Sequence, residues 1–155
     1  MPPTIVWVHG LGDSGSGWAH LKNELRLPGV EYILPDAPDN PVSCNNGARM
    51  PSWMDLAKIP VAMGDKNDVE GLKASAAIIH RQIDAALAKG TASQDVVIGG
   101  FSQGGAMALY AGYTYPQTLA GVVVFSGWAP LQAADEVTFM GEVAGATWMS
   151  RWTSP

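Results

Sequence analysis

The chain has 155 residues, which is enough for about one domain. Its net charge is −5 and its few Lys and Arg residues are scattered, so we expect neither nucleic acid nor an anionic membrane surface as a partner. Cys44 is the only cysteine, which excludes an internal disulfide framework and fits a reducing compartment. The N-terminus lacks a signal-peptide pattern and no apolar run reaches about 18 residues, so we expect a cytoplasmic protein without stable membrane insertion.

The first part of the chain predicts two buried strands joined through a glycine-rich loop and a short helix. Residues 4–9 are a continuous apolar run rich in β-branched side chains, and the loop 10–17 follows it. Residues 18–27 have the apolar spacing of a short amphipathic helix. Residues 30–34 predict the second strand.

Residues 36–64 contain several prolines and show little periodicity, which predicts a long irregular excursion. Loops of this length in compact domains are usually functional or disordered. The stretch 50–56 is too apolar for disorder, so we expect it to fold back over the functional site.

The rest of the chain alternates helix and strand. Residues 68–89 predict the longest helix, with Gly90 as its C-cap, and 95–98 the next strand. A helix over 103–113 and a strand over 119–125 follow. This alternation predicts an α/β fold, a mostly parallel sheet with helices on both faces.

The most informative stretch is 99–105, Gly-Gly-Phe-Ser-Gln-Gly-Gly, between the third predicted strand and its helix. In that context G-x-S-x-G indicates a nucleophile elbow, a turn so tight that Gly100 and Gly104 have almost no room for a Cβ. Such a turn lifts the Ser102 hydroxyl clear of the sheet, beside a helix N-terminus. The alternative is a glycine-rich loop that holds a phosphate or nothing.

Beyond the elbow, four further motifs carry a family resemblance, and all five are, in chain order, His9–Gly15 with Trp18, Pro35–Pro38 with Pro41–Cys44, Met50–Asp55, Gly99–Tyr110 and Ser126–Leu131. With these motifs the chain resembles the acyl-protein thioesterase/lysophospholipase-carboxylesterase family of serine hydrolases. The resemblance implies an α/β-hydrolase fold and hydrolysis of acyl thioesters or esters, with palmitoylated proteins or lysophospholipids as substrates. It implies no metal or other cofactor.

The same resemblance assigns roles to individual residues. Ser102 would be the nucleophile, and the backbone N–H groups of Leu11 and Gln103 would form the oxyanion hole. Three further residues would line an acyl channel: Trp53, Met54 and Trp128. The alternative for the two tryptophans is that they are ordinary core aromatics. Of the three histidines, His9 would be structural, and His20 and His80 are expected at the surface.

The sequence departs from the family after the elbow. A serine needs a histidine to take its proton and an acid to orient that histidine, in the chain order Ser, acid, His. No histidine follows Ser102, and the acids that do are Asp135, Glu136 and Glu142. We therefore expect a partial α/β-hydrolase domain over 1–131 that lacks the last strands, followed by a divergent tail over 132–155.

Three functional hypotheses remain open at this point. The first is a serine hydrolase whose chain alone is nearly inactive, because loss of the histidine costs about 10⁶-fold in turnover. The second is a non-catalytic acyl-binding or interaction protein that keeps the pocket. The third is a fragment without a stable fold. We also expect the strand over 119–125 to become an exposed edge if no further strand covers it.

Overall fold

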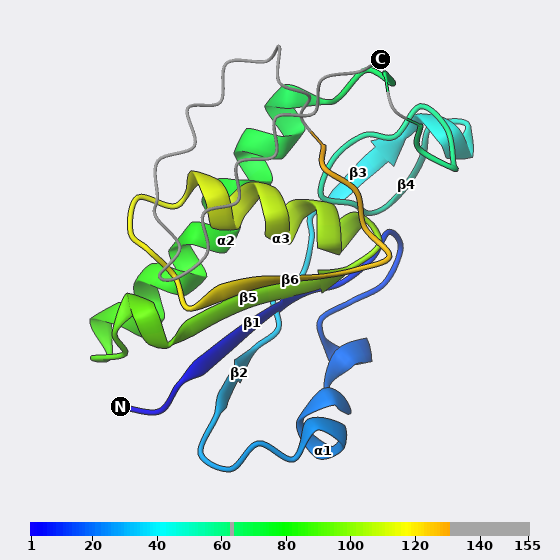
Figure 1. The fold of residues 1–155 in the computed structure, drawn as a ribbon. Coiled ribbons are helices and arrows are strands. Elements are labelled where there is room, and N and C mark those ends of the chain that lie inside the picture. Colours follow the sequence, from blue (N-terminus) through cyan, green and yellow to red (C-terminus); the bar gives the residue numbers. More distant parts are fainter. Residues whose placement is uncertain (63, 131–155) are drawn as a thin grey trace, which may run out of the picture.

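The structure is a computed structural model that describes residues 1–62 and 64–130. A parallel sheet in the strand order β2-β1-β5-β6 forms its centre, and an antiparallel pair, β3 with β4, lies apart from that sheet (Figure 1). The elements in chain order are β1 (Thr4–Val8), α1 (Leu21–Leu25), β2 (Glu31–Ile33), β3 (Asp39–Val42), β4 (Ala48–Pro51), α2 (Val69–Ala88), β5 (Val96–Phe101), α3 (Gln103–Thr114) and β6 (Gly121–Phe125). Short 3₁₀ turns lie at Ser16–Trp18, Ser43–Asn45 and Ser93–Asp95.

Helices cover the sheet from both sides, as the alternating pattern predicts. α2 and α3 lie on one face and α1 lies on the other (Figure 1). The α2–α3 face holds the core, where the buried strand residues are Val6, Val8, Val96 and Ile98 and the helices contribute Leu72, Ile79, Ile83 and Met107. Continuous apolar strands are what a parallel sheet between two helix layers requires.

α2 follows the predicted helix within one residue at each end. Asp68 is its N-cap, with Oδ1 accepting the Gly71 N–H at 3.0 Å, and Gly90 follows its C-cap, Lys89, with φ of 99°. A capping acid and a glycine beyond the C-cap are strong boundary signals, which explains the agreement. The expected helix over 18–27 is shorter in the structure, because only 21–25 is α-helical and Arg26 turns left-handed at φ 49°.

The prediction that 36–64 is irregular throughout is wrong for its first half. β3 and β4 pair over four residues each, from Asp39 opposite Pro51 to Val42 opposite Ala48. Asn46-Gly47 makes the turn between them with φ of 55° and 77°. Asn-Gly is a known hairpin signal, and proline is tolerated because each strand of an isolated pair has a free edge.

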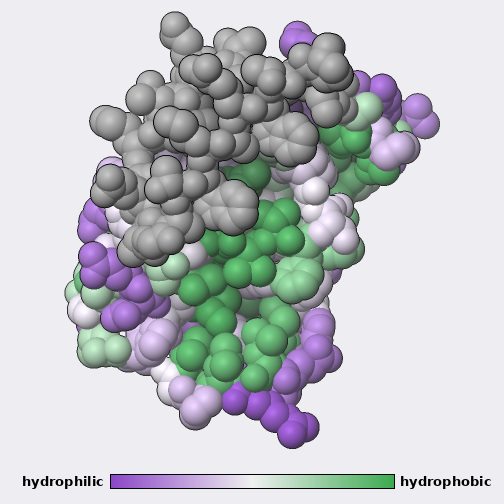
Figure 2. Space-filling view, in the orientation of Figure 1, coloured by the Kyte–Doolittle hydropathy of each residue, from purple (hydrophilic) through white to green (hydrophobic). Residues whose placement is uncertain are grey.

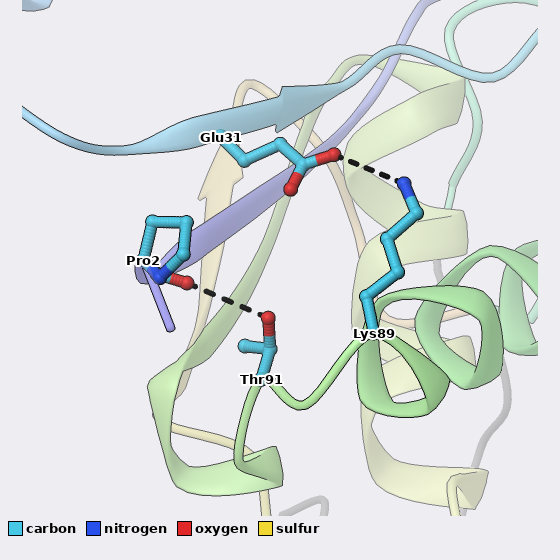
Figure 3. Close-up of polar contacts among 4 residues, drawn as sticks. All are labelled: Pro2, Glu31, Lys89 and Thr91. Carbon is cyan, nitrogen blue, oxygen red and sulfur yellow. Dashed lines mark hydrogen bonds and ion pairs between the residues drawn. The ribbon is translucent and has the colours of Figure 1, made fainter.

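At the amino ends of the strands, two polar contacts join the chain just after α2 to the start of β2 and to the start of the chain (Figure 3). Lys89 Nζ lies 3.3 Å from Glu31 Oε1, and the Thr91 hydroxyl lies 3.5 Å from the Pro2 carbonyl oxygen. The Lys89 side chain is largely exposed and that of Glu31 is 38% exposed, so this ion pair contributes at most about 1 kcal/mol.

β6 is an edge strand within the described residues, since its one strand partner there is β5, paired from Val97 with Gly121 to Phe101 with Phe125. Its side chains are partly exposed, 39% at Val123 and 55% at Phe125. Figure 2 shows hydrophobic side chains gathered across the middle of this view of the molecule. The apolar sequence of β6 suits burial on both faces, but its side chains are only partly buried. Within the described residues, β6 has one strand partner and forms an edge of the sheet.

Candidate active site

Ser102 lies at the turn between β5 and α3. Its backbone has φ 54° and ψ −120°, a conformation rarely adopted by residues with a side chain. The Ser102 N–H donates to the Phe125 carbonyl oxygen at 2.9 Å, and its own carbonyl accepts the Ala106 N–H at 3.1 Å, which begins α3. The strand runs on to Phe101, three residues beyond the predicted end at Ile98, so the turn is confined to the serine itself.

The two glycines of the pentapeptide sit where no side chain fits. A Cβ on Gly104 would lie 2.1 Å from the Val8 carbonyl oxygen, and one on Gly100 would lie 2.2 Å from the Gly104 carbonyl oxygen. Both obstacles are backbone atoms of β1 or of the turn. The turn therefore packs directly against β1, which is the geometry that a nucleophile elbow requires.

The loop after β1 lies beside Ser102, because β1 and β5 are parallel neighbours that end at the same edge of the sheet. A Cβ built on Gly10 would lie 3.7 Å from the Ser102 Cβ. Among the described residues, no hydrogen bond uses the backbone N–H of Leu11 or of Gln103. Both N–H groups therefore remain candidates for the oxyanion hole that the family resemblance implies.

Two carboxylates hold the loop in shape. Asp13 accepts the Trp18 indole N–H at 2.9 Å and the Ser14 N–H at 2.8 Å. Asp36 accepts the Gly15 N–H at 2.7 Å. Both acids belong to the motifs quoted above, although the sequence does not reveal their partners.

The segment 51–54 lies against both the loop and the elbow. Its Pro51 carbonyl accepts the Gly12 N–H at 2.8 Å, and the Trp53 indole N–H donates to the His9 carbonyl at 2.9 Å. The apolar stretch therefore folds back onto the loop after β1, which lies beside Ser102. The Gln103 side chain meets the same segment from α3, and this contact was not anticipated from the sequence.

Gln103 is fully buried and its side-chain amide is bonded at both ends. Its Oε1 accepts the Trp53 N–H at 3.0 Å, and its Nε2 donates to Ser52 Oγ at 2.9 Å and to the Met54 carbonyl at 2.8 Å. Buried polar side chains are almost always hydrogen-bonded, but the burial of Gln103 is a property of the fold, and its place after the serine in the sequence does not reveal its partners.

The three residues expected in an acyl channel separate into two groups. Trp53 is fully buried, its ring packs against His9 with centroids 5.2 Å apart, and it belongs to the core cluster, which is the alternative that the sequence left open. Met54 and Trp128 line a pocket together with Leu56, Val61 and charged residues at its rim. Ser102 is not among the residues that line this pocket.

The carboxylate beside Met54 is held ionised. The Ser43 hydroxyl and then its backbone N–H donate to Asp55 and lower the pKa of this carboxyl below its ordinary value. The Asp55 N–H in turn donates to Asp68 Oδ2 at 2.8 Å, so the pocket wall is joined to the cap of α2.

None of the histidines lies within hydrogen-bonding distance of the Ser102 hydroxyl in the part of the chain that the structure describes. His9 is buried; its Nε2 accepts the Ala37 N–H at 3.0 Å, so its Nδ1 donates to the Gly10 carbonyl at 2.7 Å. His20 is exposed and stacks on Trp18, as expected. His80 is half-buried rather than at the surface, because its Nε2 lies 2.8 Å from the Ala111 carbonyl of α3.

Two further findings concern residues 1–62 and 64–130 alone. They contain no group of three or more His, Cys, Asp or Glu side chains that could hold a metal ion. No helix within these limits is long and apolar enough to cross a membrane.

Comparison with known proteins assigns the chain and its fold to a family. The model of the phospholipase/carboxylesterase family matches residues 2–141. The chain belongs to this family. Acyl-protein thioesterase 1 of Schizosaccharomyces pombe is 45% identical over 129 residues, which are 83% of this chain and 57% of that protein.

Solved structures from this family have the same fold. The crystal structure of SOBER1 from Arabidopsis thaliana superimposes with a TM-score of 0.82 at 38% identity, over 85% of this chain and 64% of that one. That of acyl-protein thioesterase 2 from Zea mays gives 0.71 at 37% identity, over 83% of this chain and 58% of that one. The expected α/β-hydrolase fold is thereby confirmed.

The phospholipase/carboxylesterase relatives are hydrolases by name, carboxylesterases and acyl-protein thioesterases. The chain spans about half the length of the curated relatives it matches. The predicted boundary at residue 131 and the tail 132–155, with Asp135, Glu136 and Glu142, lie outside the described residues, so those expectations stay predictions.

Proposed function

We propose that this chain carries the nucleophile and the oxyanion hole of a serine hydrolase that cleaves acyl thioesters or esters. The observation that carries the proposal is Ser102 at a strained turn, where two segments meet that carry the N–H groups of Leu11 and Gln103, neither of which has a hydrogen-bond partner among residues 1–62 and 64–130. Family membership supports the same reaction class.

In the proposed reaction, Ser102 Oγ attacks the acyl carbonyl carbon and the carbonyl oxygen becomes an oxyanion. The N–H groups of Leu11 and Gln103 donate to that oxyanion, and loss of one such donor typically lowers turnover by about 10²- to 10³-fold. The thiol or alcohol then leaves with a proton, and water hydrolyses the acyl-serine to a carboxylic acid and free Ser102.

The serine proton needs an acceptor, and this chain provides no histidine after Ser102. His9, His20 and His80 all hydrogen bond to backbone groups elsewhere. The residual catalysis of a serine hydrolase without its histidine, on the order of 10³- to 10⁴-fold over water, comes from the oxyanion hole and binding. We therefore propose slow acylation of Ser102 by this chain, with palmitoylated proteins or lysophospholipids as the substrate class.

A fluorophosphonate probe tests the nucleophile directly, because Ser102 Oγ displaces fluoride from phosphorus and the adduct is found by mass spectrometry. We expect a single adduct on Ser102 in the folded chain, formed at least 10-fold more slowly than in a complete relative, and none in Ser102→Ala. A folded wild-type chain that stays unlabelled would contradict the proposal. Palmitoyl-thioester and lysophospholipid substrates offered in parallel identify the preferred class.

A second function, non-catalytic acyl binding, is favoured by one observation. Met54 and Trp128 line a pocket although no histidine contacts Ser102 in the described residues. Calorimetric titration with a non-hydrolysable acyl thioether separates the two, since binding that is unchanged in Ser102→Ala, together with no labelling of the wild type, supports binding alone.

A further inference from the structure

The two proposed oxyanion donors, the backbone N–H groups of Leu11 and Gln103, are connected through the buried side chain of Gln103. Gln103 contributes its backbone N–H to the hole, while its side chain points the other way and bonds to the segment 52–54 at three atoms: the Trp53 N–H, Ser52 Oγ and the Met54 carbonyl. These bonds use the amide oxygen and both amide hydrogens.

The segment that Gln103 holds is bonded in turn to both sides of Leu11. The Trp53 indole N–H donates to the carbonyl of His9, two residues before Leu11, at 2.9 Å. The Gly12 N–H, one residue after Leu11, donates to the Pro51 carbonyl at 2.8 Å. The peptide that carries the second donor therefore lies between two fixed points, and the same four-residue segment provides both.

From this chain of contacts we infer that the Gln103 side chain is the positioning group of the oxyanion hole. It sets the location of the Leu11 N–H relative to the Gln103 N–H through residues 51–54. The inference rests on the proposed function for its chemical consequence, because the two N–H groups matter only if they receive an oxyanion.

Burial makes this linkage stiff. Ser52, Trp53 and Gln103 are all buried, and water has little access to compete for their polar atoms. Each buried polar group that loses its hydrogen-bond partner raises the free energy of the native state, so these bonds favour a single arrangement of the side chains. A shift of the segment relative to α3 would break several bonds at once, so the two donors keep one spacing.

Gln103→Met is the decisive variant, because methionine fills a similar volume and keeps the backbone N–H but makes none of the three side-chain bonds. We expect the rate constant for fluorophosphonate labelling of Ser102 to fall by about 10-fold or more, less than the 10²- to 10³-fold for loss of a whole donor. The effect should appear in the maximal rate of adduct formation and leave the half-saturating probe concentration unchanged.

Three further variants separate positioning from simple loss of stability. Trp53→Phe keeps the buried ring and removes only the indole bond to His9, so it should slow labelling in the same way by a smaller factor. Asn40→Ala removes the 2.9 Å bond from Asn40 Nδ2 to the Ser52 carbonyl, on the same segment but outside the link. It should label at the wild-type rate. Gln103→Glu retains the acceptor for the Trp53 N–H and should restore part of the rate.

Hydrogen exchange of the backbone amides gives a readout that needs no chemistry at Ser102. In Gln103→Met we expect faster exchange at Gly12 and Trp53, with residues of α2 unchanged. If Gln103→Met is labelled at the same rate as the wild type, the inference is overturned while the proposed function stands. If the wild type is not labelled at all, the proposed function fails, and exchange then decides the inference alone: unchanged protection at Gly12 overturns it.

Discussion

The two faces of the sheet present different surroundings to Ser102, hydrogen-bonded polar groups on one and exposed aromatic side chains on the other. On the side of α2 and α3, polar groups are paired: Gln103 holds residues 52–54, and that segment holds the loop around Leu11. On the side of α1, the neighbours of the serine are aromatic, with Phe101 41% and Phe125 55% exposed. The contrast teaches that the two proposed oxyanion donors, the backbone N–H groups of Leu11 and Gln103, are joined by buried hydrogen bonds on one side of the serine, whereas the opposite side presents apolar surface.

The largest difference in the free energy of unfolding is expected between two glycine-to-alanine variants, one at the elbow and one in β6. A methyl group at Gly104 would lie 2.1 Å from the Val8 carbonyl oxygen, a backbone atom that cannot move without separating β1 from the elbow. Gly104→Ala should lower the free energy of unfolding by about 3 kcal/mol or more, measured by urea denaturation with tryptophan fluorescence. Gly121→Ala, in β6, meets nothing within 4 Å and should change it by about 0.5 kcal/mol or less. Equal losses of unfolding free energy in the two variants would contradict the close packing of Gly104 against β1.

Truncation of apolar side chains tests the same contrast in packing. Ile79 on α2 is completely buried, and Ile79→Ala should lower the free energy of unfolding by about 3 kcal/mol through loss of burial and a residual cavity. Phe125 is more than half exposed, and Phe125→Ala should lower it by about 1 kcal/mol or less. Thermal unfolding of both variants gives the comparison. A larger loss for Phe125→Ala would mean that the α1 side is the better packed one.

Asp68 links the start of α2 to the segment that follows Met54, on the side of the sheet where polar groups are paired. Its two carboxylate oxygens accept the N–H groups of Gly71 and Asp55, so Asp68→Ala removes the cap of α2 and the tie to the pocket wall together. We expect a loss of about 1–2 kcal/mol, measured by urea denaturation. Glu70→Ala is the matched control, because Glu70 is exposed and lies 3.6 Å from Lys73 in a surface pair, and should change stability by less than about 0.5 kcal/mol.

The smallest effect concerns pH. Ser43 lowers the pKa of Asp55 below its ordinary value of 3.8, so the ionised carboxylate contributes stability above that pH. This contribution is lost as pH falls through the folded-state pKa. Ser43→Ala should raise the pKa of Asp55, seen by NMR titration of the carboxyl, and should destabilise the protein at pH 7 more than at about pH 3. A destabilisation independent of pH would assign the role of Ser43 to packing.

Patterns local in the chain predicted most of the fold. The period of α2 and the glycines around Ser102 are imposed by backbone geometry over a few residues, and both predictions are confirmed. The prolines and the lack of periodicity predict an irregular segment instead of the β3–β4 hairpin, and that prediction leaves out Asn46-Gly47, which lies between the strands. The β5 strand continues through Gly99 and Gly100, where glycine suggested that it had ended.

The site was harder to predict, because its features depend on partners that are distant in sequence. Trp53 has the same apolar pattern whether it lines a channel or fills the core, and its complete burial in the core cluster is visible only in the fold. The role of the Gln103 side chain depends on atoms about 50 residues earlier in the chain, for which the sequence contains no local signal.

The backbone of Ser102 has an evolutionary implication. A residue with a side chain at φ 54° and ψ −120° is held in a conformation that raises the free energy of the native state by about 1–3 kcal/mol, whereas glycine adopts it readily. Random mutation under selection for folding alone would favour glycine at this position. A serine here is a sign of selection on its hydroxyl, and this reasoning applies to the ancestry of the chain whatever its own rate of turnover.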